Sequence, residues 1–494
     1  MALEQFRNIV AGRKVEAKDG GWFPTANPFD GKDWAELPRC GPADAEAAVE
    51  AAHAAFIAGD WPALTATKRG KLLRKLAELI ERDAEKLAAL EVRDNGKLYA
   101  EMLGQVRYIP EWFHYFGGLA DKIEGGVLPT DKPQMFSYTK REPLGVVVAI
   151  TPWNSPLMLL CWKLAPALAA GCTIVIKPSE FTSASTLAFA ELFAEAGFPA
   201  GVVNTITGFG GEVGPTLVEH PKVAKIAFTG GDATGAHIYQ QAARHIKHVT
   251  LELGGKSPNI IFEDANLEDA ARGAISGIFA ASGQTCIAGS RVLVQRSVYD
   301  EVVEKIVAIA RTAKLGDPMD EATQVGPITT TQQRDKVLSY IDVANADGAR
   351  CVLGGKRPDD ASLADGWFVE PTIFADVSND MRIAQEEVFG PVLSIIPFES
   401  DEDAIRIAND TIYGLAAGVW TSSIARAITM SDRLRAGTVW VNTYRAVSFM
   451  APFGGYKKSG IGRESGQHAI DEYLQTKCVW INLADGVPNP FVLR

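Results

Sequence analysis

The chain has 494 residues, of which 47% are hydrophobic and 22% are charged, and its formal net charge is −11. These proportions are typical of a folded globular protein and exclude a disordered chain. The length predicts about two to four structural units. The sequence has no block of lysine and arginine residues, so its composition argues against a nucleic-acid partner.

The six cysteines lie far apart, at positions 40, 161, 172, 286, 351 and 478. They form no CxxC pair and no metal-ligand spacing, so we expect free thiols, no metal site and a reducing compartment. The N-terminus lacks the apolar segment of a secretion signal. The longest apolar stretch, 157–170, contains Lys163 and Pro166 and is too short to span a membrane. These features predict a cytoplasmic protein without a membrane partner.

The first predicted elements are helices over 44–55 and 68–92, where an alanine-rich pattern is amphipathic. Another helix is expected at 156–170. Around and after it, short β-branched runs alternate with helical segments, as in βαβ units that build a parallel sheet. The predicted strands of this series are 145–150, 173–177, 202–206, 225–228 and 248–251, and its helices include 183–196 and 235–244.

A second α/β series follows the paired glycines Gly254–Gly255. Its predicted elements are helices at 267–281, 298–313, 331–346 and 401–409, and strands at 292–294, 350–353 and 393–397. The fold class that we expect is therefore α/β, with two doubly wound parallel-sheet domains.

Two segments fit neither series: 124–138 is a possible hairpin, and 478–481 is a short apolar strand. Each would expose a sheet edge unless something covers it. Pairing across a subunit boundary would cover both edges. We therefore expect a small β arm and a homo-oligomer.

Glycine-rich turns follow two predicted strands. In the segment 225–243, a strand leads through Gly230, Gly231 and Gly235 into a helix whose free N–H groups and positive dipole end could bind a phosphate. A second glycine cluster, which includes Gly210, follows the preceding strand. Neither cluster has the GxGxxG spacing of the usual dinucleotide motif. A tight βα turn explains each one equally well.

Charged residues lie at the ends of two other predicted strands. Lys177 ends one strand and Glu180 follows it, where an acidic residue binds ribose hydroxyls in dinucleotide folds. An exposed charged turn is the simpler explanation of this pair. Glu252 ends another strand, where partial burial would raise its pKa and suit it to act as a general base. A solvated glutamate at a domain hinge is the alternative.

Cys286 lies in GQTCIAGS, residues 283–290, among glycine, serine and threonine. Small neighbours permit a substrate to approach the thiol, and a helix N-terminus nearby would favour the thiolate. A buried structural cysteine is the ordinary alternative. None of the seven histidines shares a motif with Cys286, so a Cys–His protease has little support.

Several longer motifs occur in a fixed order: TPWNSP at 151–156, VIKPSE at 175–180, FTGG at 228–231, LELGGKSPNI at 251–260, GQTC at 283–286, EEVFGPV at 386–392 and PFGGYKKSGIGRE at 452–464. With these motifs the chain resembles the aldehyde dehydrogenase superfamily over nearly its full length. The resemblance implies a dinucleotide-binding domain at 1–120 and 142–253 and a catalytic domain at 254–465. It implies an oligomerisation arm at 121–141 and 466–494.

The resemblance also implies the reaction, in which an aldehyde is oxidised to a carboxylic acid with NAD as the expected cofactor and NADP as the alternative. Cys286 would attack the aldehyde, giving a thiohemiacetal and then a thioester. The Asn154 amide and the Cys286 backbone N–H would form the oxyanion hole. Glu252 would activate the water that hydrolyses the thioester.

The cofactor contacts follow from the same motifs. Glu387 would hold the nicotinamide ribose, and Phe389 would pack near the nicotinamide ring. Glu180 favours NAD⁺ over NADP⁺, because its carboxylate would repel a 2′-phosphate, although Lys177 could partly neutralise that phosphate. Many relatives have serine where this chain has Gly231, so only backbone N–H is available to the phosphate there. The full implied set is Ile150, Thr151, Trp153, Lys177, Ser179, Glu180, Gly210, Phe228, Thr229, Gly230, Gly231, Gly235, Leu253, Glu387 and Phe389.

The implied substrate residues are Trp162, Val447 and Phe453, whose character favours an apolar or aromatic aldehyde. Arg445 lies in the same segment and is a candidate for selecting an acidic group on the substrate. An arginine that faces solvent is the commoner case.

Three alternative functions are disfavoured by particular residues of the sequence. A CoA-acylating semialdehyde dehydrogenase is disfavoured, because such relatives generally lack the glutamate found here at 252. A cofactor-independent thiol hydrolase is disfavoured by the two ribose-binding signatures. A non-catalytic protein that retains the fold is disfavoured by the presence of Cys286, Glu252, Asn154 and Glu387. The expected partners are a small aldehyde and further copies of the chain, as a homodimer or homotetramer.

Overall fold

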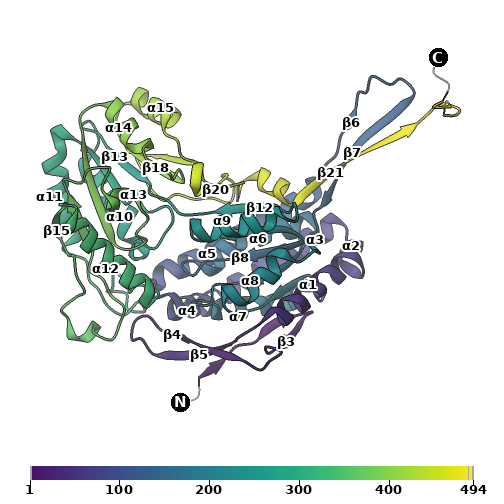
Figure 1. Cartoon of the computed structure of the whole chain (residues 1–494), viewed down its shortest axis with the longest axis horizontal. Coiled ribbons are helices and arrows are strands. Elements are labelled where there is room, and N and C mark those ends of the chain that lie inside the picture. The colour runs from purple at the N-terminus through teal and green to yellow at the C-terminus, as the bar shows by residue number, and fades with distance from the viewer. Residues whose placement is uncertain (1–2, 488, 492–494) are drawn as a thin grey trace.

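The computed structural model describes residues 3–487 and 489–491. In that part of the chain, two large sheets are each covered by helices on both faces, and two three-stranded sheets are added at the periphery (Figure 1). The central strands of both large sheets are buried except for the partly exposed Ile150 and Pro397, as expected for parallel strands covered on both faces. The predicted fold class, with two α/β units and a small β arm, is confirmed.

The first large sheet has the strand order β20-β12-β11-β8-β9-β10-β2-β3. Its five central strands are parallel: β12 (His248–Glu252), β11 (Val223–Thr229), β8 (Val146–Ile150), β9 (Thr173–Lys177) and β10 (Val203–Thr205). From β8 the chain first winds towards β10 and later returns to β11 on the other side. Loops that leave β8 and β11 therefore diverge, which opens a crevice at the carboxyl edge of the sheet.

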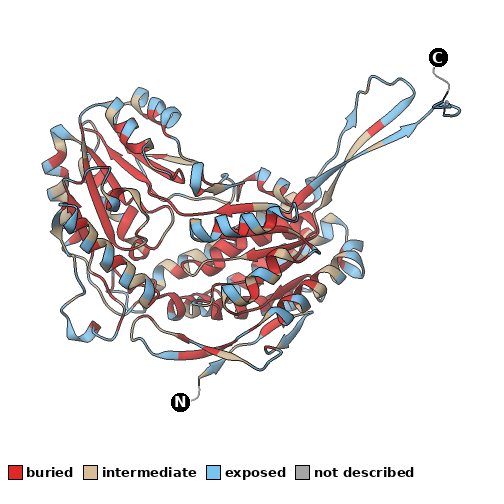
Figure 2. Ribbon diagram, in the orientation of Figure 1, coloured by how far each residue is buried: buried red, intermediate tan, exposed pale blue. Residues whose placement is uncertain are grey.

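Helices enclose this sheet in two layers. The layers contain α1 (Pro42–Ile57), α3 (Ala66–Arg82), α4 (Ala84–Asn95), α5 (Tyr99–Leu119), α6 (Pro156–Ala170), α7 (Ala184–Ala196), α8 (Gly210–Glu219) and α9 (Asp232–Ala243), with the short α2 (Asp60–Ala63) after α1. All fifteen residues of α6 are buried, because α3 and α5 pack outside it. Figure 2 shows this interior in red.

The second large sheet has the order β15-β16-β17-β14-β13-β18-β19. Its strands are β13 (Pro258–Ile261), β14 (Arg291–Gln295), β15 (Arg350–Leu353), β16 (Thr372–Ala375), β17 (Val392–Phe398), β18 (Ala416–Trp420) and β19 (Thr438–Val441), and only β15 is antiparallel to its neighbour. Its helices are α10 (Leu267–Phe279), α11 (Tyr299–Ala310), α12 (Thr331–Ala346), α13 (Arg382–Gln385), α14 (Asp401–Asn409) and α15 (Ile424–Arg433). The fully buried Arg291 donates to the carbonyl oxygens of Lys256, Ile407 and Ala408, which ties β14 to its surroundings.

The third sheet, β21-β7-β6, projects from the body of the molecule (Figure 1, upper right). Strand β6 (Val127–Leu128) pairs with β7 (Met135–Pro143), which confirms the predicted hairpin. The C-terminal β21 (Leu474–Asn482) pairs with β7 along its whole length, so the two segments that fit neither domain lie together. Much of this arm is exposed in Figure 2. Residues 488 and 492–494 of the expected arm lie outside the described residues.

Several expected boundaries differ from the structure. The helix predicted at 68–92 is two helices, because Asp83 leaves helical geometry between α3 and α4. The expected arm includes Gln467–Tyr473, but this 3₁₀ helix packs against α6 and buries Ala469, Ile470 and Tyr473 in the body. The expected 254–465 unit includes β20 (Gly460–Ile461), which pairs instead with β12 of the first sheet.

The short N-terminal strands were not predicted. Strands β2 (Asn8–Val10) and β3 (Arg13–Val15) extend the first large sheet as an antiparallel edge. Strands β1 (Glu4–Gln5), β4 (Trp22–Ala26) and β5 (Asp33–Pro38) form the fourth sheet. None of the helices in the described ranges combines the length and apolar character needed for a membrane span. The cytoplasmic location stays a prediction.

Candidate active site

Two cavities meet at the carboxyl edge of the first sheet. The first, here called the sheet-edge cavity, has a volume of about 160 Å³ and lies where β8, β11 and β12 end. It is lined by Pro152, Trp153, Asn154, Leu159, Thr229, Gly230, Gly231, Glu252, Leu253, Gly254, Cys286, Gln333, Lys336, Glu387 and Phe389. Its position is the point where the winding of the sheet reverses, at which ligands bind in open α/β folds.

The second cavity, here called the side cavity, has a volume of about 500 Å³. It is lined by Ala100, Glu101, Gly104, Gln105, Tyr108, Asn154, Ser155, Met158, Leu159, Trp162, Ser276, Thr285, Cys286, Ile287, Arg445, Val447 and Phe453. Asn154, Leu159 and Cys286 line both cavities. The thiol and the Asn154 amide therefore lie at the junction of the two spaces.

Tight packing of glycines holds the loop that carries Cys286. Gly283 has φ +71°, and a Cβ there would lie 2.0 Å from the carbonyl oxygen of Gly390. A Cβ at Gly255 would lie 2.6 Å from the carbonyl oxygen of Cys286. Larger residues at these two positions would push the loop away, so Gly283 of GQTC and Gly255 of LELGGK allow the loop that carries Cys286 to pack closely against its neighbours.

The environment of Cys286 opposes ionisation of the thiol. The pKa of Cys286 is raised to about 12, chiefly by burial and in addition by the negative charges of Glu387 and Glu252. The residue follows a short 3₁₀ helix, Ala280–Gly283, and is not at the start of an α-helix. The expectation that a helix N-terminus would favour the thiolate is therefore wrong. At rest the residue is a thiol that must lose its proton before it can attack.

Asn154 joins the two large units at this point. It lies in the loop between β8 and α6, and its Nδ2 donates to the carbonyl oxygen of Gln284 at 2.9 Å. Asn154 is 5% exposed, so the amide has little freedom to rotate. Its position beside Cys286 suits a donor that stabilises the negative oxygen formed when the thiol sulfur adds to a carbonyl group.

Glu252, the last residue of β12, is buried in the wall of the sheet-edge cavity. Neither carboxylate oxygen has a hydrogen-bond partner within the residues that the structure describes. Burial raises the pKa of Glu252 well above its ordinary value, and the charge of Glu464 raises it further. A carboxyl group with a raised pKa can exchange a proton at a pH near neutrality.

Lys163 and Glu464 were not expected at the site. The buried Lys163 Nζ donates to Glu464 and, at 2.6 Å, to Thr229 Oγ1. The Lys163 ammonium opposes the rise in the pKa of Glu252. A signal was present in the sequence, since a charged residue inside the apolar run 157–170 needs a buried partner. Glu464 ends the last motif, but sequence distance gives no reason to pair them.

Seven of the fifteen expected cofactor residues line the sheet-edge cavity: Trp153, Thr229, Gly230, Gly231, Leu253, Glu387 and Phe389. The other eight do not line it: Ile150, Thr151, Lys177, Ser179, Glu180, Gly210, Phe228 and Gly235. Most of these eight lie along the same sheet, at the ends of β8, β9 and β11 or in the helices that follow. Lys177 Nζ and Glu180 Oε2 form an ion pair of 2.9 Å just beyond the end of β9.

Helix α9 begins beside the sheet-edge cavity and places the positive end of its dipole there. A Cβ at Gly231 would meet no atom within 4 Å, so the backbone is open to a ligand. Gly235 packs against Leu253, where a Cβ would lie only 2.5 Å from the leucine side chain. The arrangement fits the close approach of a phosphate group.

Glu387 and Phe389 come from the second unit and face the same cavity. Glu387 Oε1 accepts a hydrogen bond from the Gly255 N–H at 2.8 Å. The rings of Phe389 and Trp153 are edge to face, with centroids 5.2 Å apart. Gln333 of α12, which sequence reasoning missed, donates to the carbonyl oxygens of Val388 and Phe389 at 2.8 and 2.9 Å. Gln333 therefore holds this segment against the cavity.

The expected substrate residues Trp162, Val447 and Phe453 all line the side cavity. The rings of Trp162 and Phe453 have centroids 5.1 Å apart. Arg445 lines the same cavity and is partly buried, so the structure does not place it as an ordinary surface arginine.

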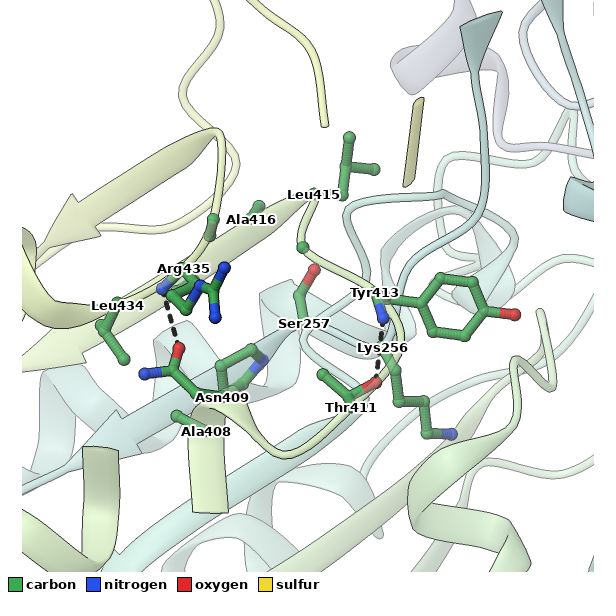
Figure 3. Close-up of a pocket in the computed structure, with 14 residues that line it drawn as sticks. Lys256, Ser257, Ala408, Asn409, Thr411, Tyr413, Leu415, Ala416, Leu434 and Arg435 are labelled. Carbon is green, nitrogen blue, oxygen red and sulfur yellow. Dashed lines mark hydrogen bonds between the residues drawn. The ribbon is translucent and has the colours of Figure 1, made fainter. Parts of the chain in front are cut away.

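Another hollow in the second unit is lined by residues such as Ser257, Asn409 and Leu415. In Figure 3, Lys256 and Tyr413 lie on one side of it and Leu434 and Arg435 on the other, where the Arg435 N–H donates to Asn409 Oδ1 at 2.7 Å. Its volume is about 10 Å³, which is room for about one water molecule. This hollow is a gap in the packing and is too small for an organic ligand.

One group of residues in the described ranges could hold a metal ion: Glu46, Glu50 and His220. His220 Nε2 lies 3.1 Å from Glu46 Oε2, and Lys222 Nζ lies 2.6 Å from Glu50 Oε1. Lys222 therefore already neutralises one of the carboxylates. The group lines neither the sheet-edge cavity nor the side cavity.

Comparison with known proteins agrees with this geometry. A profile described as the aldehyde dehydrogenase family matches residues 15–479. A (Z)-2-((N-methylformamido)methylene)-5-hydroxybutyrolactone dehydrogenase of Acinetobacter baylyi is 47% identical over 496 residues and covers 100% of both chains. A betaine aldehyde dehydrogenase of Bacillus subtilis is 45% identical, over 98% of this chain and 99% of the relative.

Solved structures give the same result. The crystal structure of betaine aldehyde dehydrogenase from Staphylococcus aureus in complex with NAD⁺ superposes with a TM-score of 0.97 at 44% identity. The match covers 98% of this chain and 96% of that chain. A match of this extent in both sequence and structure shows that the chain belongs to the aldehyde dehydrogenase family.

Proposed function

We propose that this protein oxidises an aldehyde to a carboxylic acid with NAD⁺, through a covalent intermediate on Cys286. The observation that carries the proposal is the position of Cys286 and Asn154 at the junction of two cavities. An aldehyde can reach the thiol from the side cavity while a dinucleotide occupies the sheet-edge cavity. The NAD⁺ complex of the S. aureus relative supports this choice of cofactor.

In the proposed first stage, Cys286 Sγ loses its proton and attacks the carbonyl carbon of the aldehyde. The carbonyl oxygen then carries a negative charge, which the Asn154 amide and the Cys286 backbone N–H stabilise. Bound NAD⁺ supplies the acceptor for the hydride that leaves the same carbon. The loss of hydride converts the thiohemiacetal on Cys286 into a thioester.

In the second stage, water hydrolyses the thioester. Glu252, as a carboxylate, accepts a proton from the water, whose oxygen adds to the acyl carbon. The carbon–sulfur bond then breaks, which releases the acid and returns Cys286. A buried carboxylate beside the thiol favours hydrolysis over transfer of the acyl group to a thiol such as CoA.

The residues that would hold the cofactor are spread along the sheet edge. The backbone at Gly230 and Gly231 and the N-terminus of α9 suit the pyrophosphate. Glu387 suits the nicotinamide ribose, because its carboxylate faces the same cavity as Cys286. The pair Lys177–Glu180 lies at the end of β9 and suits the adenosine ribose.

Two variants test the roles of Cys286 and Glu252. Cys286→Ala should abolish NADH formation while NAD⁺ still binds. Glu252→Gln should retain a burst of NADH but lower steady turnover by about 10²–10⁴-fold, the range for loss of a general base. Stopped-flow absorbance of NADH at substoichiometric enzyme measures both the burst and the steady rate.

Cys478→Ala is the matched control, because this thiol is exposed on the arm. It should keep full activity. Equal loss in Cys478→Ala and Cys286→Ala, with both proteins folded, would show that Cys286 has no special role. Loss of the burst in folded Glu252→Gln would show that Glu252 is needed before the thioester forms.

The charge of Glu464 should set the lower pH limit of thioester hydrolysis. This charge raises the pKa of Glu252, so the base form of Glu252 is lost as the pH falls through that raised pKa. Glu464→Gln should lower the pKa of Glu252 and move the acidic limb of kcat to lower pH, by about one unit for a nearby like charge.

Glu472→Gln is the control for this shift, because the charge of Glu472 acts on Glu252 in the same direction as that of Glu464 but more weakly. It should move the acidic limb less than Glu464→Gln does. An acidic limb that stays in place, or rises, in Glu464→Gln would contradict the proposed coupling. The measurement is kcat against pH under conditions where hydrolysis limits turnover.

The position of Glu180 predicts that NAD⁺ is preferred over NADP⁺. A carboxylate can accept bonds from both ribose hydroxyls but repels a 2′-phosphate. The ion pair with Lys177 weakens this repulsion, so we expect a preference and not exclusion. Glu180→Gln should narrow the ratio of kcat/KM for the two cofactors, and Glu191→Gln, an exposed residue on α7, should not. Equal kcat/KM for both cofactors in the wild type would refute the preference.

We also infer that the chain forms a homodimer or homotetramer through its arm. Large apolar side chains are exposed on the arm, including Val127, Phe136 and Trp480, of which Trp480 is 54% exposed. The double variant Phe136→Lys/Trp480→Lys should lower the mass measured by light scattering, whereas Ile424→Lys, exposed on α15, should not. A wild-type monomer, or an unchanged mass in the double variant, would contradict the inference.

A further inference from the structure

The wall of the side cavity has an apolar part and a polar part. The apolar part includes Met158, Leu159, Trp162, Ile287, Val447 and Phe453. The polar part includes Glu101 and Gln105 on one face of α5, Ser276 on α10, and Arg445 in the loop after β19. An aldehyde in this cavity would therefore lie along apolar side chains while part of it faces charged groups.

Arg445 is a cation on this wall whose N–H donors are mostly unpaired. One of its terminal nitrogens, Nη1, donates to the carbonyl oxygen of Ser276 at 3.3 Å. A guanidinium group carries five N–H donors, so most of them are left for a ligand. Across residues 3–487 and 489–491, Arg445 forms no ion pair with a carboxylate. Its positive charge is therefore available inside the cavity.

The backbone holds Arg445 in an unfavourable conformation. Its φ is +68°, in the left-handed region that residues with a Cβ rarely adopt, and Asn442 in the same loop has φ +53°. Such conformations persist only where the surrounding structure enforces them, and they concentrate at functional sites. The constrained loop thus fixes the backbone from which the guanidinium reaches the cavity wall.

The other charges around the cavity do not cancel that of Arg445. Glu101 Oε1 accepts a hydrogen bond from the Ala281 N–H at 3.0 Å. The buried Lys97 donates to Ser155 Oγ at 3.1 Å. Burial lowers the pKa of Lys97 to about 8, and among nearby charges Glu101 opposes this most while Arg445 adds to it. Glu101 lines the same cavity, and its Oε2 has no hydrogen-bond partner among the described residues. No ion pair in that part of the chain joins Glu101 to Arg445, so the guanidinium is not held by this carboxylate.

These observations favour one chemical class of substrate. A carboxylate would form a charge-assisted, bidentate pair with a partly buried guanidinium. A quaternary ammonium group would meet like charge and could accept none of the free N–H donors. The relatives named betaine aldehyde dehydrogenases show only that the family can act on a betaine aldehyde.

We propose that Arg445 selects aldehydes that carry a carboxylate at the end remote from the reacting carbonyl. The proposal rests on the proposed function, because the side cavity is taken as the aldehyde site. It assigns substrate specificity to one side chain, and it makes the enzyme a semialdehyde dehydrogenase acting on dicarboxylic semialdehydes.

The test uses three aldehydes of matched length, with a carboxylate, a methyl group or a trimethylammonium group at the far end. The wild type should show the highest kcat/KM for the carboxylate and the lowest for the trimethylammonium aldehyde. Arg445→Met keeps an apolar stem of similar length but removes the charge. It should lower the ratio of kcat/KM for the carboxylate over the methyl aldehyde by about tenfold or more, the loss expected for a partly buried charged pair.

Two further variants separate the pair from a structural effect. Arg445→Lys keeps the charge but lacks the planar fork, so it should restore part of the ratio. Arg272→Met is the matched control: Arg272 lies on the same helix as Ser276, lines a neighbouring hollow and does not line the side cavity. It should leave the ratio of kcat/KM for the carboxylate over the methyl aldehyde within about twofold of wild type, because Arg272 forms only an exposed ion pair, with Asp269.

The outcomes distinguish failure of the selectivity proposed for Arg445 from failure of the proposed function. If the methyl aldehyde is oxidised with NAD⁺ but the ratio is the same in wild type and Arg445→Met, the selectivity is overturned while the proposed function stands. Preference of the wild type for the trimethylammonium aldehyde overturns it as well. If no aldehyde reduces NAD⁺, the proposed function fails and the selectivity falls with it.

Discussion

The candidate site depends on contact between two units of the fold that do not share a sheet. The Asn154 amide, from the loop after β8, donates to the carbonyl oxygen of Gln284 in the loop that carries Cys286. A second bond, from the Gly255 N–H to Glu387, holds the segment between the two sheets against the second unit. Because both bonds lie at the sheet-edge cavity, a shift between the units would move the thiol away from the donors that surround it.

Burial is the dominant electrostatic effect at this junction. It raises the pKa of Cys286, Glu252 and Glu387, so each group is less charged at rest than it would be in water. A site of this kind disfavours charge on its groups at rest, and it strengthens each hydrogen bond made to a developing charge. The Lys163–Glu464 pair adds a buried proton donor and acceptor beside Glu252.

The family resemblance bears on the reaction, whereas the side cavity bears on the choice of substrate. Two full-length relatives are 47% and 45% identical to this chain, and their names give different substrates. Arg445 lies outside the long shared motifs, in a loop whose backbone is strained at two residues. In the role proposed for Arg445, specificity would depend on a loop that lies outside the sheet edge, on a scaffold that the rest of the fold keeps rigid.

Much of this structure was predictable from the residues alone. Alternating β-branched and helical runs identified the five central strands of the first sheet, because hydrophobic periodicity is a local property. The ordered motifs identified the family and pointed to Cys286, Glu252 and Asn154. The short strands β1 to β5 were not predicted. Strand β2 pairs with the distant β10, but β2–β3 and β4–β5 pair locally, so the common cause is that two to six residues are too short a stretch for a clear hydrophobic alternation.

Tertiary structure decided the charges and the environment of each group. No local pattern indicated that Lys163 would meet Glu464, some 300 residues later, because the pairing arises only when α6 packs against the C-terminal segment around the 3₁₀ helix Gln467–Tyr473. The expected thiolate at a helix N-terminus proved wrong for the same reason: the pKa of Cys286 depends on burial and on carboxylates from other segments. Sequence motifs specify which atoms are available, whereas desolvation and distance, which set their reactivity, exist only in the folded chain.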